Sequence, residues 1–244
     1  MHLVTTTLIR ALKQVRRNKG APGIDGMTVD ELPDFLRKHW PKIRQQLIEG
    51  RYHPKPVKRV EIPKPDGRQR KLGIPTVLDR LIQQAIAQIL QAEWDSDFHD
   101  NSYGFRPNRN AHQAIRYAQD TIQRDYRWVV DCDLEAFFDC VKHDLLMTQL
   151  KEKHQDLPLL RLINRYLKAG VRIEGATQAS VEGVPQGGPL SPILSNIVQV
   201  IAELRKSLLG WTGFCSCKTC ISTLHGGQSL LRHSRSSESA ARFG

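Results

Sequence analysis

Two aspartates at the end of an apolar run are the residues of this sequence best suited to chemistry. In the segment WVVDCDLEAFFD, three β-favouring residues lead directly to Asp131 and Asp133. Because side chains alternate along a strand, both carboxylates would lie on the same face of it. Hard carboxylate oxygens at a fixed separation are the ligands that Mg²⁺ takes in proteins, with substrate phosphates completing its shell. The spacing indicates a magnesium site and leaves open a solvated or salt-bridged strand end.

A loop rich in glycine and proline is the second segment that could do chemistry. The stretch VEGVPQGGPLSPILSN surrounds Gln186 with three prolines and with the adjacent glycines Gly187 and Gly188. Such a turn carries little side-chain bulk, so its backbone can approach a ligand closely. The helix expected after it offers unpaired amides at its amino end, which suit an anion. The loop indicates either a site for an anionic ligand or a purely structural turn.

A basic hairpin is the third such segment. VKRVEIPKPDGRQRKLGIP alternates apolar and charged residues around Asp66-Gly67, the pattern of two short strands joined by a tight turn. Cations on a short ribbon can fold over phosphates, although an ordinary charged edge strand has the same composition. The cations of this segment are Lys58, Arg59, Lys64, Arg68, Arg70 and Lys71.

The balance of charge favours a polyanionic partner. Lys and Arg total 36 against 25 for Asp and Glu, a net charge of +11. Each neutralised phosphate releases condensed counterions, so this excess promotes binding to nucleic acid, although a basic surface without a partner has the same composition. The first residues lack the pattern of a secretory signal, and no apolar run reaches the roughly 20 residues that cross a bilayer. We therefore expect no membrane partner. The five cysteines form no disulfide framework, which predicts a reducing, cytoplasmic location.

Helices and strands alternate along the sequence, which predicts an α/β (α+β) fold rather than an all-helical one. Thr28 and Glu31 have the spacing of a capping box at the start of the second predicted helix. From about Ser207 the sequence is rich in Ser, poor in acids and without periodicity, which predicts disorder. Helices are predicted over 1–20, 29–36, 41–50, 76–94, 111–124 and 142–153, and a further helix is predicted to end near Gly170. The other predicted elements are the hairpin over 57–75, a strand from Arg127, and an apolar helix after the glycine loop.

Taken together, these segments resemble, in order and spacing, the reverse transcriptases encoded by group II introns. The resemblance covers about Leu8 to Glu203. NKGAPGIDGMTVDEL, IPKPDGRQRKLGIPTVLDRLIQQAI and SYGFRPNRNAHQAI are similar to the family's fingers motifs, VVDCDLEAFFDCVKHDLL to polymerase motif A, and GVPQGGPLSPILSNI to motif B. The resemblance implies a right-hand polymerase with a fingers region over 1–125, part of a palm over 126–204, and an unrelated, disordered tail over 205–244.

The resemblance also implies roles for single residues. Asp133 is similar to the motif A carboxylate that binds the catalytic Mg²⁺ ions, and Asp131 is a further candidate ligand at a position where relatives vary. Phe138 corresponds to an aromatic gate against the ribose 2′-hydroxyl, unless it is a core phenylalanine. Motif A departs from its usual pattern where Glu135-Ala136 replaces Lys-Gly. The remaining implied residues are Lys64 and Arg70 for the triphosphate, Gln186 and Gly187 beneath the nascent base pair, and Lys58, Arg59, Arg68, Lys71 and Arg106 for nucleic acid.

The partners implied by the resemblance are group II intron RNA, a DNA primer or target and deoxynucleoside triphosphates. The family's second set of carboxylates lies on a YADD hairpin beyond motif B. This sequence has no Asp-Asp pair, and beyond Gly183 its only acids are Glu203 and Glu238. We therefore expect these residues alone to be inactive as a polymerase, as after a frameshift or premature end. The alternatives are an RNA-binding remnant without catalysis and the product of a pseudogene.

The tail contains one further pattern, CSCKTC, followed by His225 and His233. Thiolates and imidazoles bind zinc tetrahedrally, but the spacing is irregular for a structural zinc site. The pattern leaves open a zinc site and incidental cysteines.

Overall fold

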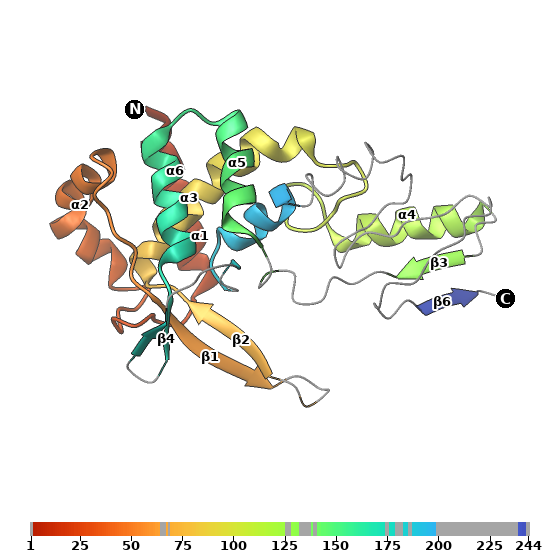
Figure 1. Ribbon diagram of the computed structural model, residues 1–244, viewed down its shortest axis with the longest axis horizontal. Coiled ribbons are helices and arrows are strands. Elements are labelled where there is room, and N and C mark those ends of the chain that lie inside the picture. Colours follow the sequence, from red (N-terminus) through yellow and green to blue (C-terminus); the bar gives the residue numbers. More distant parts are fainter. Residues whose placement is uncertain are drawn as a thin grey trace. The chain divides into compact units, whose positions relative to one another are not determined.

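A computed structural model describes residues 2–63, 67, 69–124, 128–131, 138, 141–173, 176–178, 183–184, 187–198 and 239–242 (Figure 1). Side chains are described in these ranges except at 2–6, 128–131 and 239–242. The chain divides into two compact units. Unit 1 comprises Met1–Glu93 and Ala136–Val198, and unit 2 comprises Trp94–Glu135 and Gln199–Gly244. The fingers, palm and tail segments expected over 1–125, 126–204 and 205–244 stay predictions.

Helices and strands are mixed in both units, which confirms the predicted α/β class. In unit 1 the elements are α1 (His2–Asn18), α2 (Leu32–Ile48), β1 (Val57–Pro63), β2 (Gln69–Ile74), α3 (Val77–Trp94, whose last residue belongs to unit 2), α5 (His143–Lys153), α6 (Leu157–Lys168), β4 (Val171–Ile173), β5 (Ala176–Gln178) and a helical stretch over 191–198. In unit 2 they are η1 (Asp95–Asp97), α4 (Ala111–Gln123), β3 (Trp128–Asp131) and β6 (Ser239–Arg242).

The sheet of unit 1 has four strands in the order β2-β1-β4-β5. Strands β1 and β2 form the antiparallel hairpin predicted around Asp66-Gly67, and Gly67 has the left-handed backbone (φ 81°) that glycine adopts readily. Strand β4 adds to β1 in parallel, with Val57 aligned to Val171, and β5 turns back on β4. The sequence predicted the hairpin and missed β4 and β5.

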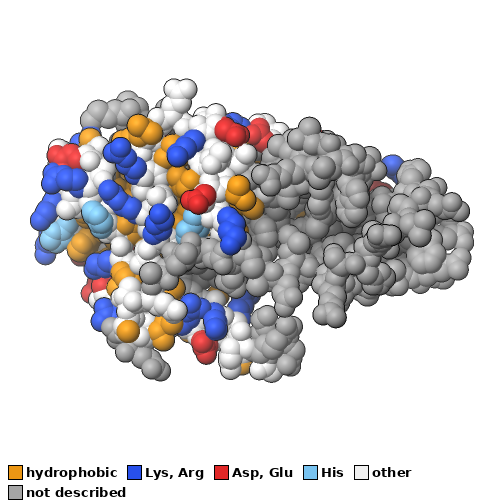
Figure 2. Space-filling view, viewed as in Figure 1, with side chains coloured by type: hydrophobic (Ala, Val, Ile, Leu, Met, Phe, Trp, Pro, Cys, Tyr) orange, Lys and Arg blue, Asp and Glu red, His pale blue; other side chains and the backbone are white. Residues whose placement is uncertain are grey.

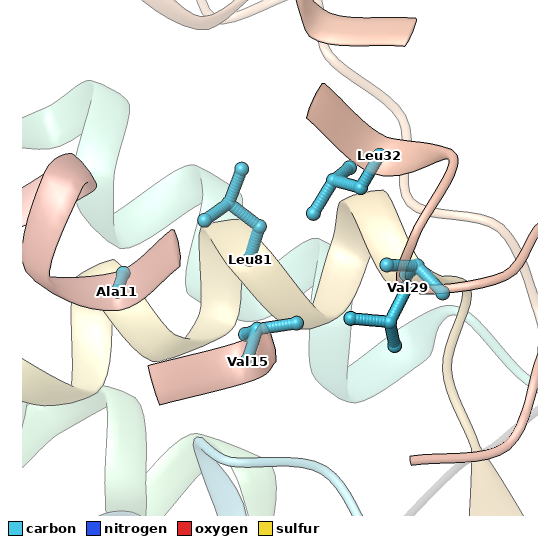
Figure 3. Close-up of a cluster of buried hydrophobic side chains, with 6 residues drawn as sticks. Ala11, Val15, Val29, Leu32 and Leu81 are labelled. Carbon is cyan, nitrogen blue, oxygen red and sulfur yellow. The ribbon is translucent and has the colours of Figure 1, made fainter. Parts of the chain in front are cut away.

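The core of unit 1 forms where α1, the start of α2 and the start of α3 meet (Figure 3). Ala11 and Val15 are four residues apart on α1, the spacing of one helix face, and both are buried. They pack with Leu81 of α3 and with Val29 and Leu32, which lie just before and at the start of α2. Burying an aliphatic side chain of this size contributes about 1.5–3 kcal/mol, so this cluster is a main source of stability for unit 1.

Helix α2 corrects the prediction of two separate helices over 29–36 and 41–50. It runs unbroken from Leu32 to Ile48 with Pro41 inside it. Proline removes one backbone hydrogen bond and crowds the preceding turn, yet tertiary packing of Leu32 and Ile43, both buried, holds the helix on either side. The predicted capping box forms only in part: Glu31 accepts from the amide and the hydroxyl of Thr28, but Glu31 itself precedes the first helical residue. These hydrogen bonds lower the pKa of Glu31 below its ordinary value.

Unit 2 contains a well-capped helix and a two-stranded pairing. Asn110 caps α4 by a reciprocal pair of hydrogen bonds with Gln113. Strand β3 pairs with β6 in antiparallel register, with Asp131 aligned to Ser239. Strand β6 (Ser239–Arg242) lies within the tail for which the sequence predicted disorder, and its backbone pairs with β3. The CSCKTC pattern lies outside the described residues.

Within the described part of the chain, none of the helices combines the length and apolar character needed to span a bilayer.

Glycines fix how the loop after α1 packs on the start of α3. A Cβ built on Gly23 would lie 2.7 Å from the Cα and the N of Thr76, and one on Gly20 would lie 2.5 Å from Nη1 of Arg80. Real Cβ atoms do not approach backbone atoms as closely as at Gly23, so the loop can pack on Thr76 only because it has no side chain at that position, whereas the neighbour of Gly20 is the end of a flexible side chain.

We predict that Gly23→Ala lowers the free energy of unfolding by about 1–3 kcal/mol, because either the loop or the Pro75-Thr76 backbone must move. Chemical denaturation followed by far-UV circular dichroism measures the change. Ala21→Ser is the matched control, because Ala21 is an exposed residue of the same loop. Equal stability of the Gly23→Ala and wild-type proteins would contradict the packing described.

Candidate functional site

The glycine loop and the basic hairpin meet within unit 1. Gly187 has a left-handed backbone (φ 119°), and a Cβ built on it would lie 2.8 Å from the carbonyl oxygen of Gly73 in β2. A Cβ on Gly188 would lie 2.4 Å from Oε1 of Gln83 in α3. The loop backbone therefore rests directly on the backbone of β2 at Gly187, where glycine is needed for the close approach, and lies against the Gln83 side chain of α3 at Gly188. Two of the three segments singled out in the sequence are thus neighbours.

Phe138 lies at the entry to the glycine loop. Its carbonyl oxygen accepts a hydrogen bond from the amide of Val184 at 2.6 Å, and the amide of Gly183 donates to Val141 at 2.9 Å. The imidazole Nε2 of buried His143 lies 2.7 Å from the carbonyl oxygen of Gly183. The Phe138 side chain is half-buried. The predicted gate residue is therefore tied through its backbone to the loop that carries Gly187, and its role as a gate stays a prediction.

The strand register divides the described cations of the hairpin between its two faces. Residues directly opposite each other in an antiparallel pair share a face. Ile62 is opposite Arg70 and Lys58 is opposite Ile74, so Lys58 and Arg70 share one face with apolar residues. The other face carries Arg59, opposite Gly73, and Lys71, opposite Glu61. Among the described residues of the hairpin, one face therefore presents two cations without a carboxylate, and the other presents two cations beside one carboxylate.

A buried carboxylate holds the base of this hairpin in place. Asp79 is 1% exposed and accepts four hydrogen bonds within unit 1. Thr76 Oγ1 donates to Oδ2 at 2.6 Å and the backbone amide of Lys55 donates to the same oxygen at 3.2 Å. The hydroxyl groups of Tyr52 and Tyr166 donate to Oδ1 at 2.7 and 3.2 Å. Burial raises the pKa of Asp79 above its ordinary value, against the four hydrogen bonds, each of which favours the carboxylate.

The two tyrosines of this network stay neutral. Burial raises the pKa of both Tyr52 and Tyr166 well above the ordinary value, and the nearby carboxylate of Asp79 raises it further. Both hydroxyl groups therefore remain donors across the whole physiological pH range. Asp79 is thereby joined to α6 through Tyr166 and to the segment before β1 through Tyr52 and Lys55.

Two arginines reinforce the same region. Buried Arg80 donates through Nη2 to the carbonyl oxygens of Ala21, at 2.6 Å, and Pro75, at 3.3 Å, and desolvation lowers its pKa. Arg165 of α6 donates to the carbonyl oxygens of Tyr52, at 2.9 Å, and Gly50. These guanidinium groups satisfy loop carbonyls that no strand or helix would satisfy.

A small cavity lies between the Asp79 network and the glycine loop, lined in part by Lys55, Gln83, Tyr166, Gly188 and Ser191. Its volume of about 20 Å³ has room for about one water molecule and is far too small for a nucleotide. A nucleotide at this place would therefore lie on the surface formed by the hairpin and the loop.

Arg106 is the predicted nucleic-acid ligand whose surroundings differ most from the prediction. It is only 8% exposed, and its guanidinium group donates to the side chain and carbonyl oxygen of Asp95 and to the carbonyl oxygens of His99 and Ser102. All three nitrogens are thus engaged inside unit 2. We therefore leave Arg106 out of the nucleic-acid surface proposed below.

The side chains of the predicted metal ligands are not among the described residues. Asp131 ends β3 in unit 2, with its side chain outside the description, and Asp133 lies outside the described residues. Lys64, Arg68 and Gln186 also lie outside the described residues. No group of three or more His, Cys, Asp or Glu in the described part of the chain could hold a metal ion. The magnesium site stays a prediction that rests on Asp131 and Asp133.

The sequence analysis missed the Asp79 network. The signal was present, because Asp79 and Arg80 interrupt the apolar stretch TVLDRLIQQAI and both are buried in α3. Charged residues are almost never buried unless they are paired, so two charges inside an apolar helix predict internal partners. The identity of those partners, from the segment before β1 and from α6, is not visible in the sequence.

Comparison with known proteins gives consistent results. A family model described as "Reverse transcriptase (RNA-dependent DNA polymerase)" matches residues 62–220. The chain is 41% identical to "Protein YkfC" of Escherichia coli (strain K12) over 197 residues, which cover 78% of this chain and 52% of that protein. It is 38% identical to "Group II intron-encoded protein LtrA" of Lactococcus lactis subsp. cremoris over 203 residues, which cover 82% of this chain and 33% of that protein.

The fold is also similar to a solved structure, "Partial Cas6-RT-Cas1--Cas2 complex", with a TM-score of 0.54 and 22% sequence identity. The match covers 90% of this chain and 36% of that one. At this level of identity the likeness shows the fold alone. The chain spans about half the length of the Escherichia coli relative and about a third of the Lactococcus one.

We predict that Asp79→Asn lowers the free energy of unfolding by about 1–3 kcal/mol, because the Asn amide nitrogen cannot accept the hydrogen bonds that one of the Asp79 oxygens accepts. The effect depends on pH. Because the pKa of Asp79 is raised in the folded state, its stabilising contribution is complete below the ordinary carboxyl pKa, about 3.9, and falls as pH rises through the folded-state pKa. The stability difference between the wild type and Asp79→Asn should therefore shrink as pH rises.

Denaturant melts of both proteins from about pH 4 to pH 8 measure this difference. Asp34→Asn is the control, because Asp34 is an exposed carboxylate paired with Arg37 on α2 and contributes little at any pH. A stability difference that grows with rising pH would contradict a raised pKa for Asp79.

Proposed function

This chain belongs to the reverse transcriptase family, among the proteins encoded by group II introns, and we propose that it supplies the fingers and part of the palm of an RNA-directed DNA polymerase. The observation that carries the proposal is the seating of Gly187 and Gly188 on β2 and α3 at the base of the basic hairpin. In that arrangement two glycines without side chains lie beside the base of a hairpin that carries cations, a combination suited to binding a base pair and its phosphates.

The charge of the surface supports a nucleic-acid partner. Lysine and arginine side chains predominate over acidic ones on the described part of the face drawn in Figure 2. Each phosphate that these cations neutralise releases counterions, which stabilises binding without reading the sequence. The partners proposed are therefore group II intron RNA, a DNA primer or target strand and deoxynucleoside triphosphates, with Lys64 and Arg70 for the triphosphate.

Magnesium enters the proposal through the resemblance in motif A. Asp133, with Asp131, would hold the ion, which in this class of reaction stabilises the attacking and leaving oxygens of phosphoryl transfer. The residues of this chain then have three tasks: the hairpin cations bind phosphates, the glycine loop supports the base pair, and Phe138 contacts the sugar.

A second candidate function is RNA binding without catalysis. It is favoured by the sequence, which beyond Gly183 has only two acids, Glu203 and Glu238, and no Asp-Asp pair anywhere. One motif A site cannot neutralise the repulsion of two divalent ions without further carboxylates. We propose that a polypeptide of these 244 residues binds RNA but does not extend a primer.

The two faces of the hairpin give a test of RNA binding. The double variant Lys58→Ala with Arg70→Ala loses two phosphate contacts. We predict that the plot of log binding constant against log salt concentration becomes less steep, its negative slope decreasing in magnitude by about 2. Arg59→Ala combined with Lys71→Ala should reduce this magnitude by about 1, since Glu61 already offsets one of those cations. Filter binding to structured intron RNA across a salt series measures both slopes.

Lys151→Ala is the control for this experiment, because it removes an exposed cation of α5 rather than of the hairpin. Unchanged slopes in both double variants would exclude the hairpin as a phosphate-binding element. Weak wild-type binding without preference for structured RNA would instead favour the product of a pseudogene.

Primer extension tests catalysis directly. We predict that the 244-residue polypeptide gives no Mg²⁺-dependent extension of a DNA primer on an RNA template, because it has no second set of carboxylates. Extension that is abolished by Asp133→Ala would contradict this prediction and would establish the chain as a polymerase.

A further inference from the structure

Phe105 is presented to solvent in an unusual way. Its side chain is 71% exposed, more than any other large apolar side chain in the part of the chain that the structure describes. It lies in unit 2, in the loop that joins η1 to α4. Single exposed apolar residues are common, so exposure alone carries no conclusion.

The backbone of Phe105 is strained. Its φ of 55° lies in the left-handed region, where a residue with a Cβ meets the following carbonyl group and where glycine or asparagine is the usual choice. Asn108, three residues later, has the same conformation, with φ 61°. A bulky aromatic residue at such a position persists only where the surrounding structure imposes it, and residues of this kind cluster at functional sites.

The neighbouring arginine is held firmly inside unit 2. Arg106 is 8% exposed and makes four hydrogen bonds of 2.7–3.0 Å within unit 2, to Asp95, His99 and Ser102. Its guanidinium group also lies over the ring of Phe98, 5.5 Å from the centroid. Because the residue next to Phe105 is fixed by these five contacts, the chain beside the exposed Phe105 side chain is anchored in the absence of any ligand.

The rest of the loop has the chemistry of a nucleic-acid contact. Residues 101–110 contain two arginines and no acid. Arg109 lies over the ring of Tyr103, 5.7 Å from the centroid, and its side chain is about one-third exposed. Its ion pair with Asp100 is long, at 3.6 Å, and Asp100 is 94% exposed, so this cation can exchange the pair for a phosphate at little cost.

We propose that Phe105 is a stacking platform for an unpaired base of a bound RNA strand, with Arg109 contacting the adjacent phosphate. Every base has a flat π-face, so a single rigid aromatic ring binds it without sequence preference. A protein partner would need a contiguous apolar patch, whereas residues 101–110 contain only Tyr103 and Pro107 as further aromatic or apolar residues, among Asn, Ser, Gly and Arg. The inference rests on the proposed function only in taking RNA as the partner.

The experiment uses the full chain and a short single-stranded RNA in which 2-aminopurine replaces adenine. Stacking on an aromatic ring quenches or shifts the fluorescence of 2-aminopurine beyond the effect of binding alone. Phe105→Ala should weaken binding of this RNA by about 5-fold to 100-fold and abolish the fluorescence change, since a base–aromatic stack has roughly that effect on affinity. Phe105→Tyr keeps the ring and should retain the wild-type affinity and the fluorescence change. Phe105→Leu keeps only apolar bulk and should show the weakened binding and no fluorescence change.

Two controls make the result specific. Ile115→Ala removes another exposed apolar side chain of unit 2, 53% exposed on α4, and should change neither affinity nor fluorescence. Binding of a fully paired RNA duplex should be the same for Phe105→Ala and the wild type, because a duplex offers no free base. Thermal melting should show no loss of stability in any Phe105 variant, since the side chain is exposed and its backbone strained.

The outcomes separate the two proposals. Wild-type binding of RNA with no effect of Phe105→Ala on affinity or fluorescence would overturn the stacking platform and leave the proposed function standing. An equal loss for duplex and single-stranded RNA would also overturn it, because the ring would then not act on a free base. No RNA binding by the wild type would overturn both. If Ile115→Ala also weakened RNA binding and reduced the fluorescence change, the effect would belong to the exposed face of α4, and the stacking role of Phe105 would be overturned.

Discussion

The geometry of unit 1 depends on one buried carboxylate. Asp79 is removed from water at the start of α3, and its burial is possible because four donors from α6, from the segment before β1 and from Thr76 surround its two oxygens. A buried polar group without partners costs about 1–3 kcal/mol, and a buried charge costs more, so these donors have little freedom to move away. The network therefore fixes three segments of the chain with respect to one another more specifically than apolar contacts would.

The candidate site inherits this constraint. Strand β1 follows the segment that carries Tyr52 and Lys55, β2 leads directly into the start of α3, and the glycine loop rests on β2 and α3. Arg80 and Arg165 fix the flanking loops by donating to their carbonyl oxygens. The hairpin cations are thus positioned by buried polar contacts at the hairpin base, while the strands themselves extend into solvent with mostly exposed residues.

Sequence reasoning succeeded where one local signal dominates and failed where partners come from distant residues. Asp66-Gly67 between alternating residues was sufficient to predict the hairpin, and the apolar face of α3 was sufficient to predict a helix. Pro41 suggested a helix break that tertiary packing overrides, and β4 and β5, three residues each, are too short for a recognisable alternation. The resemblance implied Arg106 as a nucleic-acid ligand, whereas its internal partners Asp95, His99 and Ser102 could not be read from the sequence. The magnesium ligands Asp131 and Asp133 stay predictions, because the side chains that would test them lie outside the description.

The pairing of β1 with β4 has a consequence for how the protein is made. Val57 donates its amide to the carbonyl oxygen of Gly170, so the central strand of the sheet acquires its second neighbour only from a residue more than a hundred positions later. On a ribosome the β1–β2 hairpin emerges early, with one edge of β1 unpaired, and must wait while the whole first segment of unit 2, Trp94–Glu135, is synthesised. An exposed edge during that interval is a site for wrong pairing with other nascent chains. The hairpin cations would then have a role during synthesis as well as in the folded protein. Their like charges repel the hairpins of neighbouring nascent chains until β4 has been synthesised and pairs with β1.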